Sequence, residues 1–127
     1  GGDNISPSRI EAKLDIEPEI AQSMLYGDFK NYLVAILVPN ADLALEWAKD
    51  NNVEGDLTKI IKDSSFNKKM KDVVDKVNKS LSAIEQVRKF ILVDHEFTIE
   101  NNMMTPSMKV RRFKVKEMYG ESLEKLY

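Results

Sequence analysis

The sequence predicts an α+β domain in which helices cover a small sheet, made of an antiparallel hairpin and a third strand. Two apolar segments, 20–26 and 33–38, flank a turn-rich stretch, as the strands of a hairpin do. Segments with helical spacing follow, and a further apolar segment at 90–93 is expected to be the third strand. The 127 residues are enough for one hydrophobic core, and we expect residues 1–127 to form a single domain.

The first helix is expected to begin after Ser6 and to end near Asp15. Serine is a favoured N-cap, and Pro7 fits the first helical position because the N–H that it lacks has no partner there. Ile10 and Leu14 lie four residues apart, so they share one face of this helix. That face is predicted to pack on the sheet.

The segment 33–38 is predicted to be the central strand. Pro18 separates the first helix from a strand pattern at 20–26, which forms the other arm of the hairpin. The segment 33–38 is apolar on both of its faces. This pattern is typical of a strand in the middle of a sheet that helices cover.

The remaining segments are expected to be mainly helical. Asn40 is a plausible N-cap for a helix to about Asn51, and further helices are expected at 56–62 and 66–81. An irregular stretch at 96–107 precedes a final basic helix. The apolar residues expected on the inner, buried faces of these helices are Leu43, Ala44, Trp47, Ala48, Met70, Val73, Val74 and Val77.

The composition excludes several classes of protein. Lys and Arg number 19 and Asp and Glu number 21, so the net charge of −2 provides no general attraction to nucleic acid or anionic lipid. The absence of cysteine rules out disulfides and thiolate chemistry, and it suits a cytoplasmic protein. The strongest apolar run, 33–39, is much shorter than the ~20 residues of a membrane helix, and no signal-peptide pattern is present.

His95 is the only histidine, and it lies between Asp94 and Glu96. Aspartate–histidine pairs occur in catalytic triads, but the chain has no cysteine, and no serine in a recognisable nucleophile turn, for this histidine to activate. We therefore interpret His95 as a residue at the surface or at the end of a strand. A metal site is not expected, because no second histidine is available.

A basic cluster follows the turn-forming residues 105–107. A cation at such a loop-to-helix junction can be presented rigidly to a phosphate or a carboxylate. Two alternatives remain open, a solvated face of a surface helix and a module that binds nucleic acid or another anion. The balanced net charge and the single aromatic residue in the cluster, Phe113, weaken the nucleic-acid interpretation. The cluster consists of Lys109, Arg111, Arg112, Lys114 and Lys116.

The two ends of the chain, considered together with the hairpin between them, indicate a function. Residues 1–11 (GGDNISPSRIE) resemble the loop that follows the hinge of AMP-forming acyl-CoA synthetases, although a Gly-Gly start alone could be a cloning remnant. Residues 18–39 look like the hairpin of the long-chain branch of this family. Residues 100–112 (ENNMMTPSMKVRR) are similar to its last motif, whose catalytic lysine falls on Lys109, and residues 119–127 resemble its C-terminal helix.

One departure from the family pattern concerns the residue before this lysine. Many members have Ser-Gly there, whereas this chain has Ser107 and Met108 after Thr105-Pro106. The variant resembles the long-chain fatty acid ligases. It also removes a glycine, which leaves the flexibility of the loop as an open question.

The resemblance implies that the chain is the mobile C-terminal lid of a long-chain fatty acid CoA ligase. Such an enzyme joins a fatty acid and ATP into an acyl adenylate and then transfers the acyl group to CoA. In the family the lid rotates about a hinge, so that one pose delivers the lysine for adenylation and the other delivers the post-hinge loop for thioester formation. An acyl carrier protein ligase, or the lid of another acid activator, remains an alternative.

The implied cofactors are ATP, CoA and Mg²⁺ in the full enzyme, with none bound to this chain alone, which is expected to be inactive. The implied partners are its own N-terminal domain and the fatty acid, and no nucleic acid. Any peripheral membrane association is expected to come through the missing domain. The implied catalytic residue is Lys109, and the residues implied to lie near the cofactors are Gly1, Gly2, Asp3, Asn4, Ser6 and Arg112.

Overall fold

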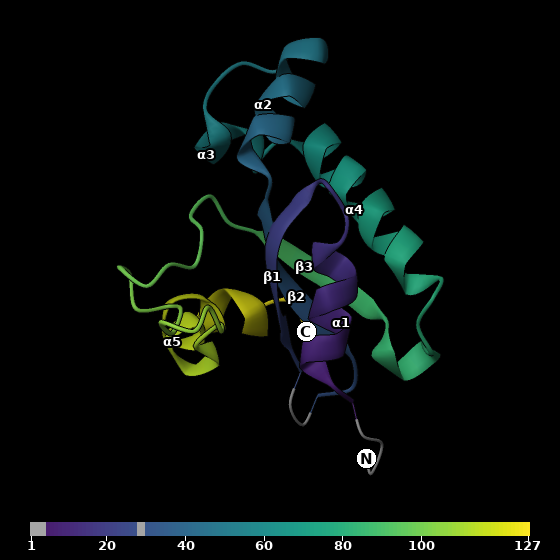
Figure 1. Ribbon diagram of the computed structural model, residues 1–127. Helices are drawn as coiled ribbons and strands as arrows, with labels where there is room; N and C mark the ends of the chain where they lie inside the picture. Colours follow the sequence, from purple (N-terminus) through teal and green to yellow (C-terminus); the bar gives the residue numbers. More distant parts are fainter. Residues whose placement is uncertain (1–4, 28–29) are drawn as a thin grey trace.

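The computed structural model describes residues 5–27 and 30–127, which form a three-stranded sheet with helices on both faces (Figure 1). The sheet order is β1 (Ile20–Tyr26), β2 (Leu33–Pro39) and β3 (Val87–Leu92). β1 and β2 pair antiparallel, which confirms the predicted hairpin, and β3 runs parallel to β2. A parallel pair needs a long crossover, and the helices between β2 and β3 provide it.

Helices cover the two faces of the sheet separately. α1 (Pro7–Asp15) and α4 (Ser64–Asn78) lie on one face, and α5 (Arg112–Glu124) lies on the other (Figure 1). The predicted α+β class is therefore confirmed. The remaining helical elements are α2 (Ala41–Asp50), α3 (Leu57–Ile60) and the short 3₁₀ helix η1 (Ala83–Glu85).

The central strand β2 supplies both halves of the core. Every residue of this strand is buried, which confirms the prediction from its two apolar faces. Because successive side chains of a strand point to opposite faces, alternate residues join different clusters. Leu33, Ala35 and Leu37 pack with α1 and α4, and Val34, Ile36 and Val38 pack with α5.

Side-chain caps set the helix starts much as expected. The Ser6 hydroxyl accepts from the backbone N–H of Arg9 at 3.4 Å, and the side-chain oxygen of Asn40 accepts from that of Leu43 at 3.1 Å. One expectation for α2 was wrong. Leu43 is 37% exposed, because the buried stripe of this short helix consists of Ala44 and Ala48.

The bounds of α4 and β3 differ from the prediction. α4 begins two residues earlier than residue 66, because Asp63 caps it by accepting from the N–H of Phe66 at 3.0 Å. It ends at Asn78, whose side-chain amide bonds both the N–H and the C=O of Val87 at 2.9 Å each. These two bonds fix Val87 as the first residue of β3, which lies before the expected start at residue 90. Among the described residues, no helix is long and apolar enough to cross a membrane.

Candidate functional site

The lysine implied by the last motif lies in a small hairpin loop before α5. An isolated bridge pairs Met104 with Val110, and inside it the Thr105 N–H donates to the Lys109 carbonyl at 2.8 Å. The Met108 N–H donates to the Thr105 carbonyl, also at 2.8 Å. These contacts define a hairpin with a three-residue loop, 106–108, and place Lys109 directly at its end.

Met108 adopts the backbone conformation that a glycine favours. Its φ is +67°, in the left-handed region, and this is the usual conformation of the last residue in a three-residue hairpin loop. Pro106 occupies the position after Thr105, where proline favours the required turn. A glycine, as in the family pattern that this motif resembles, would suit this backbone, and this chain adopts it with a methionine.

The loop is held by side chains as well as by its own backbone. The Thr105 hydroxyl accepts from the Lys109 N–H at 3.1 Å and lies 2.9 Å from the hydroxyl of Ser107. The Arg111 N–H donates to the Met103 carbonyl at 2.7 Å. Loss of the glycine has therefore not removed the contacts that fix the backbone of Lys109.

The preceding stretch, expected to be irregular, is ordered by one asparagine. The side-chain oxygen of Asn101 accepts from the backbone N–H groups of Thr98 and Met103, both at 3.0 Å, and its side-chain NH₂ donates to the Glu96 carbonyl at 2.9 Å. Phe97 and Met103 are buried under the sheet on the α5 side. The stretch has no regular secondary structure, yet its backbone is bonded and its apolar side chains are anchored.

The Lys109 side chain is exposed at the tip of this ordered support. Within the described part of the chain, its ammonium group forms no ion pair and no side-chain hydrogen bond. A solvated ammonium on a fixed backbone can approach an anionic group that another domain supplies. Such a group can neutralise charge where two anions meet.

Arg112, the other cationic residue singled out, is engaged within the chain. Its two terminal nitrogens donate to the two carboxylate oxygens of Glu11, each at 2.6 Å. Sequence reasoning missed Glu11 as a partner, although a carboxylate beside Ile10 and three residues before Leu14 lies next to the buried face of α1. The prediction that Arg112 contacts a cofactor stays a prediction.

The post-hinge segment is only partly described. Ser6 is the N-cap of α1, with its hydroxyl directed to the backbone of Arg9. Gly1, Gly2, Asp3 and Asn4 lie outside the described residues. The contact of Arg112 with Glu11 joins α1, which follows the post-hinge segment, to α5, which follows the Lys109 loop.

His95 fits its interpretation as a surface residue. Its side chain is 80% exposed and its Nε2 lies 3.6 Å from Asp94. Asp94 in turn accepts from the Thr58 hydroxyl at 2.7 Å, which is the main reason that the pKa of this carboxyl is lowered. Across the residues that the structure describes, no group of three or more histidines and carboxylates is placed to hold a metal ion.

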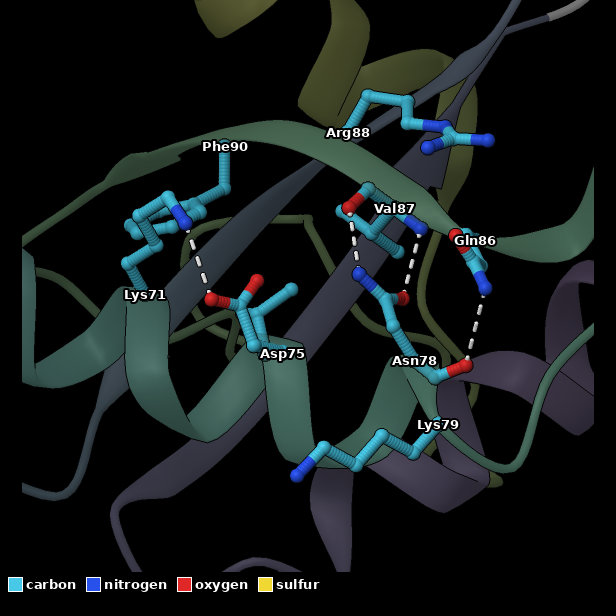
Figure 2. Close-up of a pocket in the computed structure, with 9 residues that line it drawn as sticks. Lys71, Asp75, Asn78, Lys79, Gln86, Val87, Arg88 and Phe90 are labelled. Atoms are coloured by element: carbon cyan, nitrogen blue, oxygen red, sulfur yellow. Dashed lines mark hydrogen bonds and ion pairs between the residues drawn. The ribbon is translucent and has the colours of Figure 1, made fainter. Parts of the chain in front are cut away.

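A pocket of about 390 Å³ lies between α4 and β3 (Figure 2). Several of its polar side chains are already paired. The Lys71 ammonium donates to Asp75 at 2.9 Å, Asn78 bonds the backbone of Val87, and the Gln86 amide donates to the Asn78 carbonyl at 3.3 Å. We interpret these contacts as structural, because they join α4 to β3 on the face of the sheet away from Lys109.

Comparison with known proteins gives one consistent result. The family model described as AMP-binding enzyme C-terminal domain matches residues 1–127. Long-chain-fatty-acid–CoA ligase 1 of Cavia porcellus is 27% identical over 129 residues, which cover 99% of this chain and 18% of that protein. The chain thus spans less than a fifth of the length of this curated relative.

Solved structures show the same fold. The adenylation domain of a carboxylate reductase from Mycobacterium chelonae has a TM-score of 0.80 and 31% identity, covering 97% of this chain and 18% of that chain. A didomain of the carboxylic acid reductase from Segniliparus rugosus, in complex with AMP, has a TM-score of 0.73 and 32% identity. It covers 97% of this chain and 16% of that chain.

Proposed function

This chain belongs to the family of AMP-binding enzyme C-terminal domains, and on that premise we propose that it is the mobile lid of a long-chain fatty acid CoA ligase. The proposal rests on the likeness to such a ligase over 99% of the chain and on the motifs at 1–11 and 100–112. The full enzyme would supply an N-terminal domain that binds ATP and the fatty acid. This chain would supply the lysine for the first step and the loop for the second.

The proposed role of Lys109 is electrostatic. In adenylation a carboxylate oxygen of the fatty acid attacks the α-phosphorus of ATP, a new oxygen–phosphorus bond forms, and pyrophosphate leaves. An ammonium group about 3 Å from the carboxylate and α-phosphate oxygens reduces the repulsion between the two anions. The observation that carries this role is the exposed Lys109 side chain on a backbone fixed by Thr105.

The proposed second step uses the other end of the chain. The CoA thiol attacks the acyl carbon of the adenylate, a thioester forms and AMP leaves. Gly1, Gly2, Asn4 and Ser6 are proposed to border the channel of the pantetheine arm, where absent or small side chains leave room, and Asp3 is proposed to lie near the cofactor. Mg²⁺ is proposed to be bound by the N-terminal domain of the full enzyme.

A second candidate function is the lid of an adenylation domain that passes the acyl group to a carrier protein. The likeness to the carboxylic acid reductases, at 31–32% identity, favours this candidate, because the matched Segniliparus rugosus structure is an A-PCP didomain, in which a carrier protein domain accompanies the adenylation domain. The two candidates share the adenylation step and the role of Lys109. They differ in the thiol that accepts the acyl group.

The experiment that separates them uses the full-length parent protein. It is incubated with ATP and saturated fatty acids of increasing chain length, together with either CoA or a phosphopantetheine-bearing acyl carrier protein, and the products are identified by mass spectrometry. Acyl-CoA, AMP and pyrophosphate from long-chain acids are expected. Acyl carrier protein as the sole productive acceptor supports the second candidate, and no acyl adenylate from any acid contradicts both.

A further inference from the structure

The contact between Glu11 and Arg112 is a junction of three elements. Both oxygens of Glu11 accept from Arg112 at 2.6 Å, and one of them also accepts from the backbone N–H of Leu25 on β1 at 2.8 Å. Glu11 is only 8% exposed. A paired guanidinium and carboxylate of this kind fixes orientation as well as distance, because the two hydrogen bonds are parallel.

The junction lies between the two segments to which the reaction is assigned. Glu11 is on α1, the helix that follows the post-hinge segment after Ser6. Arg112 is the first residue of α5, three residues after Lys109, so their Cα atoms are within about 11 Å even for an extended chain. The Arg111 N–H adds a second anchor on the Met103 carbonyl, at 2.7 Å.

We propose that Glu11 and Arg112 are positioning residues, whose ion pair locks the Lys109 loop to α1. The two functional segments then move as one body when the domain rotates, and the lysine arrives at a fixed orientation. This inference rests on the proposed function. It assigns Arg112 to the support of Lys109 and not to a contact with substrate, because each terminal nitrogen of Arg112 donates to a carboxylate oxygen of Glu11 and so directs the guanidinium toward α1.

The test uses the full-length ligase with Glu11→Gln, Arg112→Gln and the double variant. Adenylation is measured by pyrophosphate exchange, and CoA transfer is measured from supplied acyl adenylate. Each variant is expected to lower kcat of adenylation about 10- to 100-fold, because a lysine misplaced by 1 Å loses its alignment. The double variant is expected to lose no more than either single variant, because the pair acts as a unit. KM for ATP and the CoA transfer rate are expected to stay near wild type.

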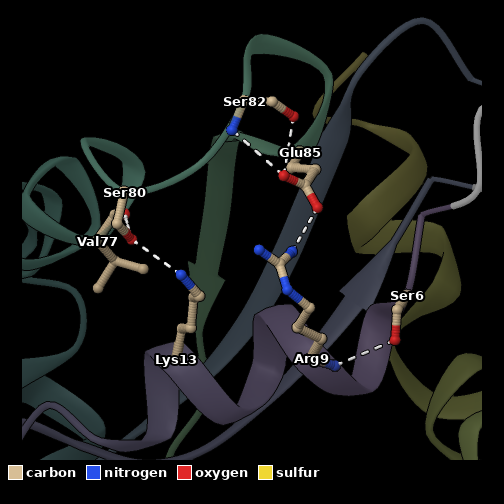
Figure 3. A network of polar contacts seen from close by, with 7 residues as sticks. All are labelled: Ser6, Arg9, Lys13, Val77, Ser80, Ser82 and Glu85. Carbon is tan, nitrogen blue, oxygen red and sulfur yellow. Dashed lines mark hydrogen bonds and ion pairs between the residues drawn. The ribbon is translucent and has the colours of Figure 1, made fainter.

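A second ion pair on the same helix provides a matched control. Arg9 donates to Glu85 at 2.5 Å and so ties α1 to the 3₁₀ helix η1 (Figure 3). Figure 3 shows that this contact and the bond from Lys13 to Ser80 hold α1 to the segment after α4, not to α5. Arg9→Gln therefore removes an arginine and an inter-element ion pair from α1, and it is expected to leave adenylation near wild type.

Arg112→Lys keeps the charge but loses the paired geometry, and it is expected to retain the fold by thermal melting while still lowering kcat of adenylation. Wild-type adenylation in this folded variant and in Glu11→Gln would overturn the inference. Additive losses with a raised KM for ATP would also overturn it, because Arg112 would then contact substrate.

Lys109→Ala in the same assay separates the two proposals. A loss there with no loss in the pair variants refutes the inference alone, whereas no loss there refutes the proposed function.

Discussion

Gln22 and Phe97 form a two-way amide contact, although 75 residues separate them. The Gln22 NH₂ donates to the Phe97 carbonyl at 3.0 Å, and its side-chain oxygen accepts from the Phe97 N–H at 2.7 Å. The side chain of Gln22 on β1 therefore bonds the backbone of Phe97 as a neighbouring strand would. Phe97 begins the ordered stretch that supports the Lys109 loop. This contact connects β1 to the ordered stretch that precedes the Lys109 loop.

Gln22→Leu is expected to weaken this region. The substitution leaves the N–H and the C=O of Phe97 without their partners, so we expect the free energy of unfolding to fall by about 1–3 kcal/mol. Urea unfolding measures the loss, and amide hydrogen exchange is expected to rise at 97–111. Gln86→Leu, which removes only longer bonds of 3.3 and 3.4 Å at the other side of the sheet, is the control. Unchanged exchange at 97–111 in Gln22→Leu contradicts the role given to Gln22.

Met108 is expected to tolerate glycine better than a β-branched residue. The residue is 65% exposed, so little packing is lost, while its φ of +67° strains any L-residue. We expect Met108→Gly to raise the free energy of unfolding by about 0.5–1 kcal/mol and Met108→Val to lower it by about 1 kcal/mol or more. Urea unfolding of both variants tests this, and an equal loss in the two argues against strain at this position.

Asp15 is expected to make the stability depend on pH. Partial burial of the carboxyl is the main cause that raises the pKa of Asp15 from its ordinary value of 3.8 to about 6, with the bond from Ser23 lowering it and the charge of Glu11 raising it. The folded carboxyl holds its proton where the unfolded one has lost it, so this group reduces stability progressively as the pH rises from about 4 to about 6. Asp15→Asn is expected to remove this fall.

The measurement for Asp15 is the difference in unfolding free energy between Asp15→Asn and wild type from pH 4 to pH 7. This difference isolates one carboxyl, because the other acidic groups are common to both proteins. The difference is expected to grow in favour of the variant as the pH rises. A difference that is flat across this range contradicts the raised pKa.

Gly1→Leu in the full enzyme is expected to slow CoA transfer and to spare adenylation. The reason is the proposed passage of the pantetheine arm along residues 1–6, where a leucine side chain takes up room. Transfer from supplied acyl adenylate and pyrophosphate exchange are measured in parallel. An equal fall in pyrophosphate exchange indicates a structural role for this segment instead.

The sequence predicted the parts of the fold that depend on local pattern. The capped start of α1 and the apolar faces of β2 were sufficient to predict a helix and a central strand. The parallel direction of β3 was not predicted, because a short apolar segment carries no sign of its direction. The end of α4 was misplaced because Asn78 forms contacts with Val87, and the burial of Leu43 was overestimated because its spacing fits two faces of a short helix.

The candidate site was predictable only in its motif residues. Lys109 was identified because residues 100–112 resemble a family motif. Such a motif identifies a residue but does not show which contacts hold it in place. The contacts of Gln22 with Phe97 and of Glu11 with Arg112 join residues 75 and 101 positions apart, and no local pattern encodes such pairs. The left-handed backbone of Met108 was hidden for a different reason, since methionine rarely adopts it.

The central claim is that Lys109 acts in adenylation alone, and the two half-reactions of Lys109→Ala in the full enzyme test it most directly. The account predicts a loss of about 10²- to 10³-fold in pyrophosphate exchange, with transfer from supplied acyl adenylate to CoA retained. Equal losses in the two half-reactions, or no loss in exchange, would contradict the account.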